Sequence, residues 1–236
     1  IRTCGLKREE VFVTTKLDAA IKDYDGTQAA IEGSLERLGL DYIDLMIIHA
    51  PQPWTAFRED NHYFEGNLAA WCAMEKAYKA GRLRAIGVSN FQQVDIENLL
   101  QNGDVKPMVN QILAHVSNTP FALIDYCHKH DILVEAYSPM GHGEMMKNRL
   151  VQDMANRYGV SIARLCIRYC LQLGLLPLPK TANPEHMEAN ADVDFEISGQ
   201  DMEILKNVER IRNYGEASLF PVYGGKLDEK GNYTPR

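Results

Sequence analysis

Short apolar runs, each ending in a polar residue, alternate along the chain with stretches of helical periodicity. The clearest run covers residues 45–48, where four consecutive apolar side chains predict a strand buried on both faces, as in a parallel sheet. Pro51 has no N–H for a sheet ladder, so this strand ends at His49. Six strands are predicted in this way, over residues 10–16, 45–49, 83–90, 108–112, 132–138 and 175–180.

Helices are predicted between these strands from apolar spacing and from capping residues. Thr27 is the expected N-cap of the first helix, and Asn183 with Pro184 opens a later one. Ser161 and Ser198 are expected N-caps as well. The helices are expected over residues 27–38, 67–80, 90–101, 120–130, 149–158, 162–173, from 183 onward, and over 199–210.

Three segments carry no such periodicity. Residues 52–65 are polar and aromatic and too long for a plain connection, and long loops of this kind are commonly functional. Residues 139–143 are expected to form a loop. Residues 211–236, rich in Gly, Tyr and Pro, are expected to form an irregular C-terminal tail.

The order of these elements predicts the fold class. Strands that alternate with helices form an α/β protein with a parallel sheet. Six βα units are visible in the sequence, whereas a closed (β/α)8 barrel needs eight.

The composition narrows the class of partner. Hydrophobic residues make up 45% and charged residues 24% of the chain, as in a typical globular protein, and no apolar stretch approaches the roughly 20 residues of a membrane helix. A net charge of −7 without a basic run argues against nucleic acid or a membrane as the partner. Five cysteines without a C-x-x-C motif fit a reducing, cytoplasmic setting. Cys166 and Cys170 are expected in the core, and no metal site is expected.

A polar or charged residue stands at the end of every predicted strand. Each has an ordinary explanation when taken singly, because a lysine there is usually solvated and a Ser-Asn pair is a common helix cap. A protein with only a core to build has no reason to place polar groups at all six strand ends. Together they predict a functional rim made of Lys16, His49, Ser89, Asn90, Gln111, Tyr137, Ser138, Lys180 and Thr181.

These strand ends lie in six short motifs. The segments are residues 13–17 (Val-Thr-Thr-Lys-Leu), 41–45 (Asp-Tyr-Ile-Asp-Leu) leading to 49–51 (His-Ala-Pro), 87–91 (Gly-Val-Ser-Asn-Phe), 109–112 (Val-Asn-Gln-Ile), 135–141 (Glu-Ala-Tyr-Ser-Pro-Met-Gly) and 179–181 (Pro-Lys-Thr). Any one motif is weak, but six in the right order are specific, and from Val11 to Arg210 they resemble the aldo-keto reductase family. The resemblance implies a (β/α)8 TIM barrel, with six of its eight units visible here, as a single domain over residues 1–236.

The resemblance also implies a nicotinamide dinucleotide bound without a Rossmann domain, and the absence of a G-x-G-x-x-G motif agrees with this. By position, Ser89, Asn90 and Gln111 match the residues that bind the nicotinamide carboxamide. Asn and Gln offer the complementary donors and acceptors. Tyr137 matches the residue that stacks on the nicotinamide ring and so selects its reactive face.

The phosphate side of the cofactor is matched by later strand ends. Ser138 and the following loop, with Met140, match the pyrophosphate-side contacts. Lys180 and Thr181 match the contacts to the 2′-phosphate that distinguishes NADP(H) from NAD(H).

The resemblance assigns catalysis to two residues. His49 matches the histidine that orients and polarises the substrate carbonyl, and Lys16 matches the lysine that lowers the pKa of a catalytic tyrosine, because a nearby cation favours the phenolate. The implied reaction reduces an aldehyde or ketone with hydride from NADPH, while the tyrosine protonates the oxygen. Ala50, where the family often has a bulky aromatic residue, and Trp54 are expected in a roomy substrate pocket.

The tyrosine of the family, and the aspartate that pairs with the lysine, belong to the first two barrel units. Only fifteen residues precede Lys16. We therefore expect this sequence to be part of a longer polypeptide, with roughly 40–60 further residues at its start, judging from about 30 residues per βα unit. The intact mass of the purified protein tests this expectation.

The last motif departs from the family pattern. His186 stands in place of an arginine, and Ala189 in place of a glutamate that precedes Asn190. A guanidinium suits a phosphate and an adenine face better than a neutral imidazole does. Lys180 and Thr181 still favour NADP(H), with NAD(H) as the other candidate.

Two alternative hypotheses assign the chain to a different class of protein. A non-catalytic nucleotide-binding relative could keep the fold, but it would have no need for Lys16 and His49. An unrelated phosphate-binding barrel enzyme would share the alternation of elements but not the six ordered motifs. The expected partner is a small carbonyl compound and the expected assembly a monomer or weak homo-oligomer, with the substrate left open.

Overall fold

The computed structural model describes residues 3–228 and 230–234. The remaining positions of the predicted domain and tail, residues 1–2, 229 and 235–236, lie outside the described residues. The chain forms two compact units, Ile1–Asn110 and Gln111–Arg236, so that strand β4 (Val109–Leu113) leaves the first and enters the second. The single-domain organisation stays a prediction.

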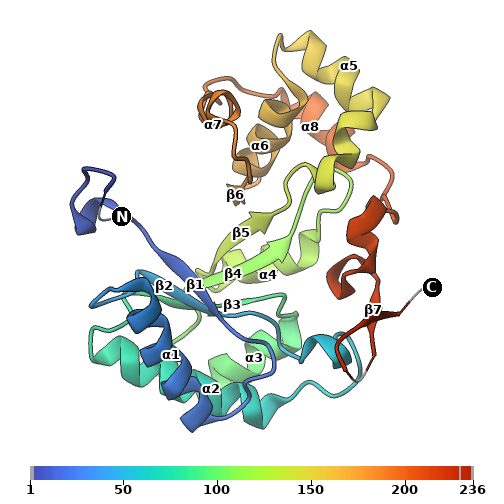
Figure 1. Ribbon diagram of the computed structural model, residues 1–236. Coiled ribbons are helices and arrows are strands. Elements are labelled where there is room, and N and C mark those ends of the chain that lie inside the picture. The colour runs from blue at the N-terminus through green and yellow to red at the C-terminus, as the bar shows by residue number, and fades with distance from the viewer. Residues whose placement is uncertain (1–2, 229, 235–236) are drawn as a thin grey trace. The chain divides into compact units, whose positions relative to one another are not determined.

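The first unit is a parallel α/β layer whose strands run in the order β1-β2-β3 (Figure 1). Lys16 pairs with Ile47, and Ile48 pairs with Val88. Every residue of β2 and β3 is buried, which confirms the strand predicted to be buried on both faces. Helices α1 and α2 pack on each other, as do α2 and α3. The elements are β1 (Thr14–Leu17), α1 (Tyr24–Leu38), β2 (Leu45–Ile48), α2 (Phe64–Lys79), β3 (Ile86–Ser89) and α3 (Gln93–Asn102).

The second unit repeats the alternation and then becomes mainly helical (Figure 1). Strands β5 and β6 are parallel, with Glu135 opposite Leu176. Helix α4 packs on β5, and α6 packs on β6 and on its neighbours α5 and α7. The elements are α4 (Phe121–Lys129), β5 (Leu133–Tyr137), α5 (Arg149–Arg157), α6 (Ile162–Gln172), β6 (Leu176–Leu178), α7 (Pro184–Ala191) and α8 (Gly199–Lys206).

Short elements occupy several connections. Most are single 3-10 turns, and the segment predicted as an irregular tail contains two of them and a small antiparallel pair. The loop expected at residues 139–143 overlaps the start of a 3-10 element at Gly141, whose backbone is non-helical at His142 and Gly143. These elements are η1 (Arg8–Glu10), η2 (Trp54–Ala56), η3 (Gly141–Lys147), η4 (Gly215–Leu219), η5 (Pro221–Tyr223), β7 (Lys226–Leu227) and β8 (Tyr233–Thr234).

Three of the four predicted N-caps are confirmed. The side chains of Ser161, Asn183 and Ser198 each accept a hydrogen bond from a backbone N–H of the helix that follows. The prediction for Thr27 is wrong, because Asp23 caps α1 by accepting from the N–H of Gly26 (2.7 Å). The helix therefore begins one turn earlier than expected.

The first strand is shorter than predicted for a local reason. The Asp44 carboxylate accepts the N–H of Val13 (2.9 Å) and the guanidinium of Arg8 (2.6 Å). The N–H of Val13 thus bonds a side chain, while its carbonyl accepts from the N–H groups of Asp44 and Leu45, and β1 begins at Thr14.

The cysteines differ sharply in exposure. Cys127, Cys166 and Cys170 are buried, all in the second unit, which confirms the core position expected for the last two. Burial raises the pKa of the Cys170 thiol to about 12, and it raises that of Cys166 as well. Cys4 and Cys72, both in the first unit, are exposed.

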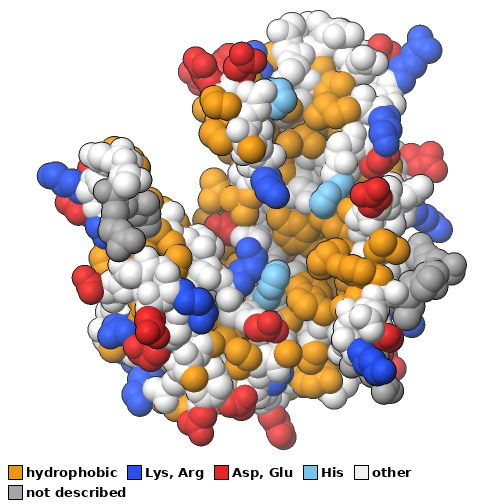
Figure 2. Space-filling view, in the orientation of Figure 1, with side chains coloured by type: hydrophobic (Ala, Val, Ile, Leu, Met, Phe, Trp, Pro, Cys, Tyr) orange, Lys and Arg blue, Asp and Glu red, His pale blue; other side chains and the backbone are white. Residues whose placement is uncertain are grey.

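Charged side chains of both signs are mixed on the face of the molecule that Figure 2 shows. On the face shown in Figure 2, acidic and basic groups are interspersed within each unit rather than gathered by sign. Among the described helices, none is long and apolar enough to cross a bilayer.

Candidate active site

His49 follows β2 directly, and its N–H donates to the carbonyl of Leu17 (3.1 Å). This bond extends the β1–β2 ladder one residue beyond the strand and fixes the backbone of His49. Burial lowers the pKa of His49 to about 4, the charge of Lys16 lowers it too, and Asp18 opposes them. The imidazole is therefore neutral at pH 7, with one N–H to donate.

The end of β3 is tied to the end of β2. The Asn90 side chain donates to the carbonyl of His49 (3.0 Å) and to the Ser89 hydroxyl oxygen (3.1 Å). Asn90 has a φ of 61°, a left-handed conformation that asparagine tolerates better than most residues. Lys16, His49 and Asn90, predicted separately from three strand ends, are thus brought together in the first unit.

The loop after β2 places an aromatic ring against His49. The ring of Trp54 lies perpendicular to the imidazole at a centroid distance of 4.9 Å, and Phe57 packs on Trp54 at 5.2 Å. Ala50 is fully buried. The indole of Trp54 therefore lies beside the catalytic candidate even though the residue next to His49 is small.

Two predicted cofactor residues of the second unit have specific partners. The Gln111 amide nitrogen donates to the buried Glu135 carboxylate (2.7 Å). Ser138, directly after β5 and Tyr137, shares a hydrogen bond with the hydroxyl of Tyr223 (2.9 Å), which lies in the tail. The tail and the predicted pyrophosphate loop are thus connected.

The loop after Ser138 has an unusual backbone. Ser138, Gly141, His142 and Gly143 all have positive φ, and Met140 precedes the 3-10 turn. His142 shares a second hydrogen bond with the Tyr223 hydroxyl (2.7 Å). One tail hydroxyl therefore bridges two side chains of a loop that is held in a sparsely populated conformation.

The last predicted residues lie after β6. Lys180 is exposed, and the Thr181 hydroxyl oxygen accepts from the N–H of Asn183 (3.1 Å), which leaves the hydroxyl hydrogen able to donate. His186 and Asn190 lie on α7, a helix with no buried residue.

Several buried or partly buried polar groups were not predicted. Lys22, Asn67 and Asp95 form a polar network with His62 beneath the loop after β2, and His115 bonds the hydroxyl of Tyr214 (3.0 Å). Only the polar and aromatic character of residues 52–65 hinted at this network, since its partners are 30 or more residues apart in several cases. No set of three His, Cys, Asp or Glu residues within the described part of the chain is placed to hold a metal.

Comparison with known proteins supports a family assignment. The family described as "Aldo/keto reductase family" matches residues 4–210. The chain is 39% identical over 216 residues to a glyoxal reductase of Bacillus subtilis, covering 91% of this chain and 74% of that protein. It is 40% identical over 203 residues to an uncharacterised oxidoreductase of the same organism, covering 86% and 69%.

Solved structures agree. An aldo-keto reductase from a deep-sea metagenome library superposes with a TM-score of 0.80 at 34% identity, covering 88% of this chain and 74% of that one. A Bombyx mori aldo-keto reductase in complex with NADP gives a TM-score of 0.78 at 32% identity, covering 90% and 72%. The chain therefore belongs to the aldo/keto reductase family: it is an NADP-dependent oxidoreductase of the α/β (β/α)8 barrel class that reduces aldehyde or ketone carbonyls to alcohols.

Proposed function

We propose that His49 and Lys16 are the catalytic residues of this carbonyl reduction. The observation that carries the proposal is a partly buried imidazole, kept neutral by burial and by the Lys16 charge, at the end of a parallel strand. A neutral imidazole donates its N–H to the substrate carbonyl oxygen and so orients and polarises it. An imidazolium would instead carry a charge that the surroundings of His49 disfavour.

Lys16 has a second proposed role. Its ammonium would stabilise the phenolate of the proton-donating tyrosine and bring the pKa of that group toward neutral pH. The tyrosine then passes its proton to the carbonyl oxygen. Lys16 would thus act on two groups, since its charge also disfavours protonation of His49.

The cofactor fits the chemistry of the residues proposed to hold it. NADPH, when bound, supplies the hydride. The Asn90 amide and the Ser89 hydroxyl at the end of β3 can bind a carboxamide, and Gln111 and Tyr137 complete the nicotinamide contacts in the proposal. On the phosphate side, the Ser138 hydroxyl and the Met140 loop precede Lys180, whose exposed ammonium suits a 2′-phosphate.

Thr181, His186 and Asn190 complete the proposed adenosine-phosphate contacts. The hydroxyl of Thr181 can donate to a phosphate oxygen while its own oxygen accepts from Asn183. His186 and Asn190 stand on the unburied helix α7.

We further propose a small aldehyde or ketone as substrate, with Ala50 and Trp54 beside the reacting carbonyl. A relative that is 39% identical is named a glyoxal reductase, which favours small aldehydes and 1,2-dicarbonyl compounds. Cytoplasmic residence and a monomeric or weakly associated state belong to the same proposal.

The test is NADPH oxidation with a panel of aldehydes and ketones. The wild type is expected to turn over at least one of them. His49→Ala is expected to lower kcat/KM by roughly 100-fold or more, as for loss of an oxyanion donor. His128→Ala, which removes an exposed histidine on α4, is the matched control and should keep wild-type kinetics. Full activity of His49→Ala, or no turnover of any carbonyl by the intact wild type, would overturn the proposal.

A further inference from the structure

Three backbone carbonyls around the loop that follows His49 are held by two side chains. Lys22 Nζ donates to the carbonyl of Ala50 (2.9 Å). Asn67 Nδ2 donates to the carbonyls of Pro51 (2.8 Å) and His62 (3.0 Å). Lys22 Nζ also donates to Asn67 Oδ1 (2.8 Å), so the two side chains form one unit, the carbonyl clamp.

The clamp leaves Asn67 a single orientation. Its amide oxygen accepts from an ammonium, and both hydrogens of its nitrogen have carbonyl acceptors. A flipped amide would place its NH2 group against Lys22 and its oxygen against two carbonyls. Asn67 is only 1% exposed, so water cannot replace these partners. Lys22 therefore decides which way Asn67 points, and Asn67 in turn fixes both ends of the loop.

Burial of the Lys22 ammonium in this position is energetically unfavourable. Burial lowers the pKa of its ammonium to about 8, although Asp95 and Asp18 act in the opposite direction. Both hydrogen-bond acceptors of Lys22 are neutral. A partly desolvated ammonium without a direct carboxylate partner destabilises a fold, so stability alone does not account for it.

The backbone is built to bring the clamp together. A Cβ at Gly66 would lie 2.8 Å from both the Cβ and the carbonyl oxygen of Lys22, so only glycine allows the first turn of α2 to approach this closely. Asn67 is the next residue, and it reaches Lys22 because of that approach.

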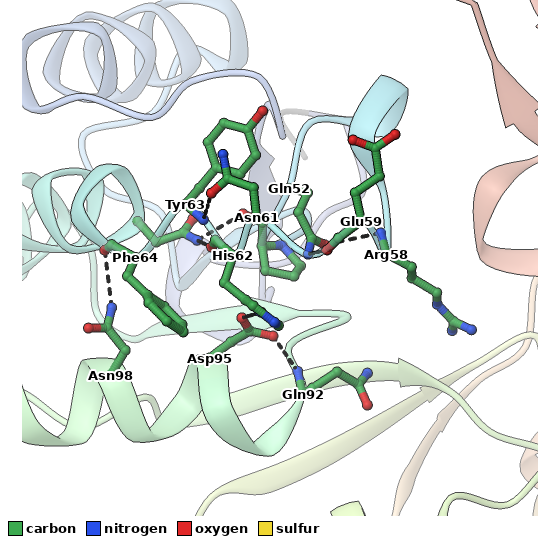
Figure 3. A network of polar contacts seen from close by, with 12 residues as sticks. Gln52, Arg58, Glu59, Asn61, His62, Tyr63, Phe64, Gln92, Asp95 and Asn98 are labelled. Carbon is green, nitrogen blue, oxygen red and sulfur yellow. Dashed lines mark hydrogen bonds and ion pairs between the residues drawn. The ribbon is translucent and has the colours of Figure 1, made fainter.

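A second pair anchors the far end of the loop to α3. The ring of His62 lies 2.7 Å from the buried Asp95 carboxylate, which also accepts the N–H of Gln92 (2.9 Å) at the start of that helix (Figure 3). Within the loop, Gln52 accepts from the N–H of Arg58 (3.4 Å) (Figure 3). The segments after β1, β2 and β3 are thus joined by side chains.

We propose that Lys22 and Asn67 are positioning residues for carbonyl reduction. By fixing the carbonyls of Ala50, Pro51 and His62, they hold His49 and the loop that carries Trp54 in the position needed for the reaction. This inference rests on the proposed role of His49. The clamp bonds backbone carbonyls and is proposed to act through the backbone on either side of the loop. Misplacement of a reacting group by about 1 Å can lower a rate by roughly 100-fold, so a rigid backbone here has a measurable value.

The first test is Lys22→Met, with Lys79→Met as the matched control because Lys79 is exposed and pairs with Asp104. Lys22→Met is expected to lower kcat by roughly 10- to 100-fold, with an unchanged KM for NADPH and no fall in melting temperature. Deuterium in the transferred position of NADPH should give a larger isotope effect on kcat, because the chemical step has become slower. A purely structural role would reduce the folded fraction and leave the isotope effect unchanged.

The second test is Asn67→Asp, which separates folding from positioning. The new carboxylate still accepts from Lys22 but cannot donate to the carbonyls of Pro51 and His62. We expect a folded protein whose kcat falls as in Lys22→Met, because the two residues act as a unit. Wild-type kcat in either variant would overturn the clamp alone. An inactive wild type would overturn the proposed function with it.

Discussion

His49 gains its properties from what surrounds it. Its N–H continues the sheet ladder, its carbonyl accepts from Asn90, and its ring lies edge-on to Trp54. Backbone and ring are thus both constrained, and desolvation keeps the ring neutral. A histidine that must present one N–H in one direction is well served by these constraints.

The depressed pKa of His49 can be measured. The imidazole should stay neutral down to a pH of about 4, and Lys16→Met should raise its pKa because a neighbouring cation is lost. Titration by ¹H–¹⁵N NMR reads both quantities. His115, whose pKa burial also lowers to about 4, is the internal control that Lys16→Met should leave in place. An unchanged His49 pKa in that variant would contradict the assigned effect of Lys16.

The lowered pKa of His49 makes the folding stability of the protein depend on pH. The pKa of His49 in the folded state lies below its unfolded value of about 6.5, so between pH 4 and 6.5 the unfolded chain binds more protons. His49 and His115 therefore reduce stability as the pH falls through this window and have no such effect above it.

The pattern of the sequence identified the site residues at strand ends, but not the residues whose side chains support them. His49 and Asn90 could be predicted because each follows an apolar run, a signal in the linear pattern. Lys22 and Asp95 carry no such signal, since their importance comes from side chains brought near by folding. Apolar runs in the sequence predict which residues lie at strand ends, but not which side chains from distant segments support those residues.

The start of helix α2 shows how an element is shaped by its neighbours. The helix begins at Phe64 after Tyr63, which has a left-handed φ of 52°. Its first turn packs on Lys22 through Gly66. The predicted start near residue 67 was three residues late, because tyrosine is not a typical N-cap residue and so gives no signal for the start of a helix.

Gly66→Ala is expected to destabilise the protein by roughly 1–3 kcal/mol, as for overpacking of a tight contact, because its methyl group would meet the Lys22 backbone. Gly33→Ala in α1 is the matched control, since a Cβ there would meet only the mobile end of Arg37 at 3.0 Å. That variant should stabilise the helix by about 0.5–1 kcal/mol. Urea unfolding measures both, and equal effects of the two substitutions would exclude the close contact at Gly66.

Helix starts with Ser or Asn at the N-cap were predicted correctly, and the failure at Thr27 is instructive. Threonine and aspartate both cap helices, and Asp23 stands four residues earlier with its carboxylate on Gly26. Thr27 instead donates back to the carbonyl of Asp23 (2.6 Å). Because two possible capping residues stand one turn apart, the sequence does not decide where the helix begins. In the structure the earlier residue, Asp23, is the N-cap.

At the scale of the whole molecule, the region after β6 is the proposed binding site for the 2′-phosphate that distinguishes NADP(H) from NAD(H). Lys180 is exposed, and Thr181 keeps a donor for phosphate. His186 occupies the place where the resemblance expects an arginine. The remaining cation should still favour the 2′-phosphate, although less strongly than a lysine and an arginine together.

Ligand-dependent unfolding tests this preference without turnover. NADP⁺ at 100 times its Kd is expected to add about 2.7 kcal/mol to the unfolding free energy, and NAD⁺ at the same concentration should add less. Lys180→Met should remove the difference, whereas Lys129→Met, on the exposed end of α4, should preserve it. Equal shifts for both cofactors in the wild type would overturn the preference for NADP(H).

The closed barrel, unlike the α/β class, could be predicted from the sequence only through its family motifs. Alternating strands and helices predicted a parallel α/β layer, which β1, β2 and β3 confirm. The same alternation fits open and closed sheets alike, so the closed barrel followed from the resemblance and from the solved relatives. Closure depends on shear and stagger, which apolar periodicity does not encode.

The distribution of thiols has a practical consequence. Cys127, Cys166 and Cys170 are buried in the second unit, while Cys4 and Cys72 are exposed in the first. A maleimide dye would therefore mark the first unit of the folded protein and spare the second. Because the spared thiols become reactive only when their surroundings open, the time course of their labelling would act as a clock for local unfolding of residues 111–236.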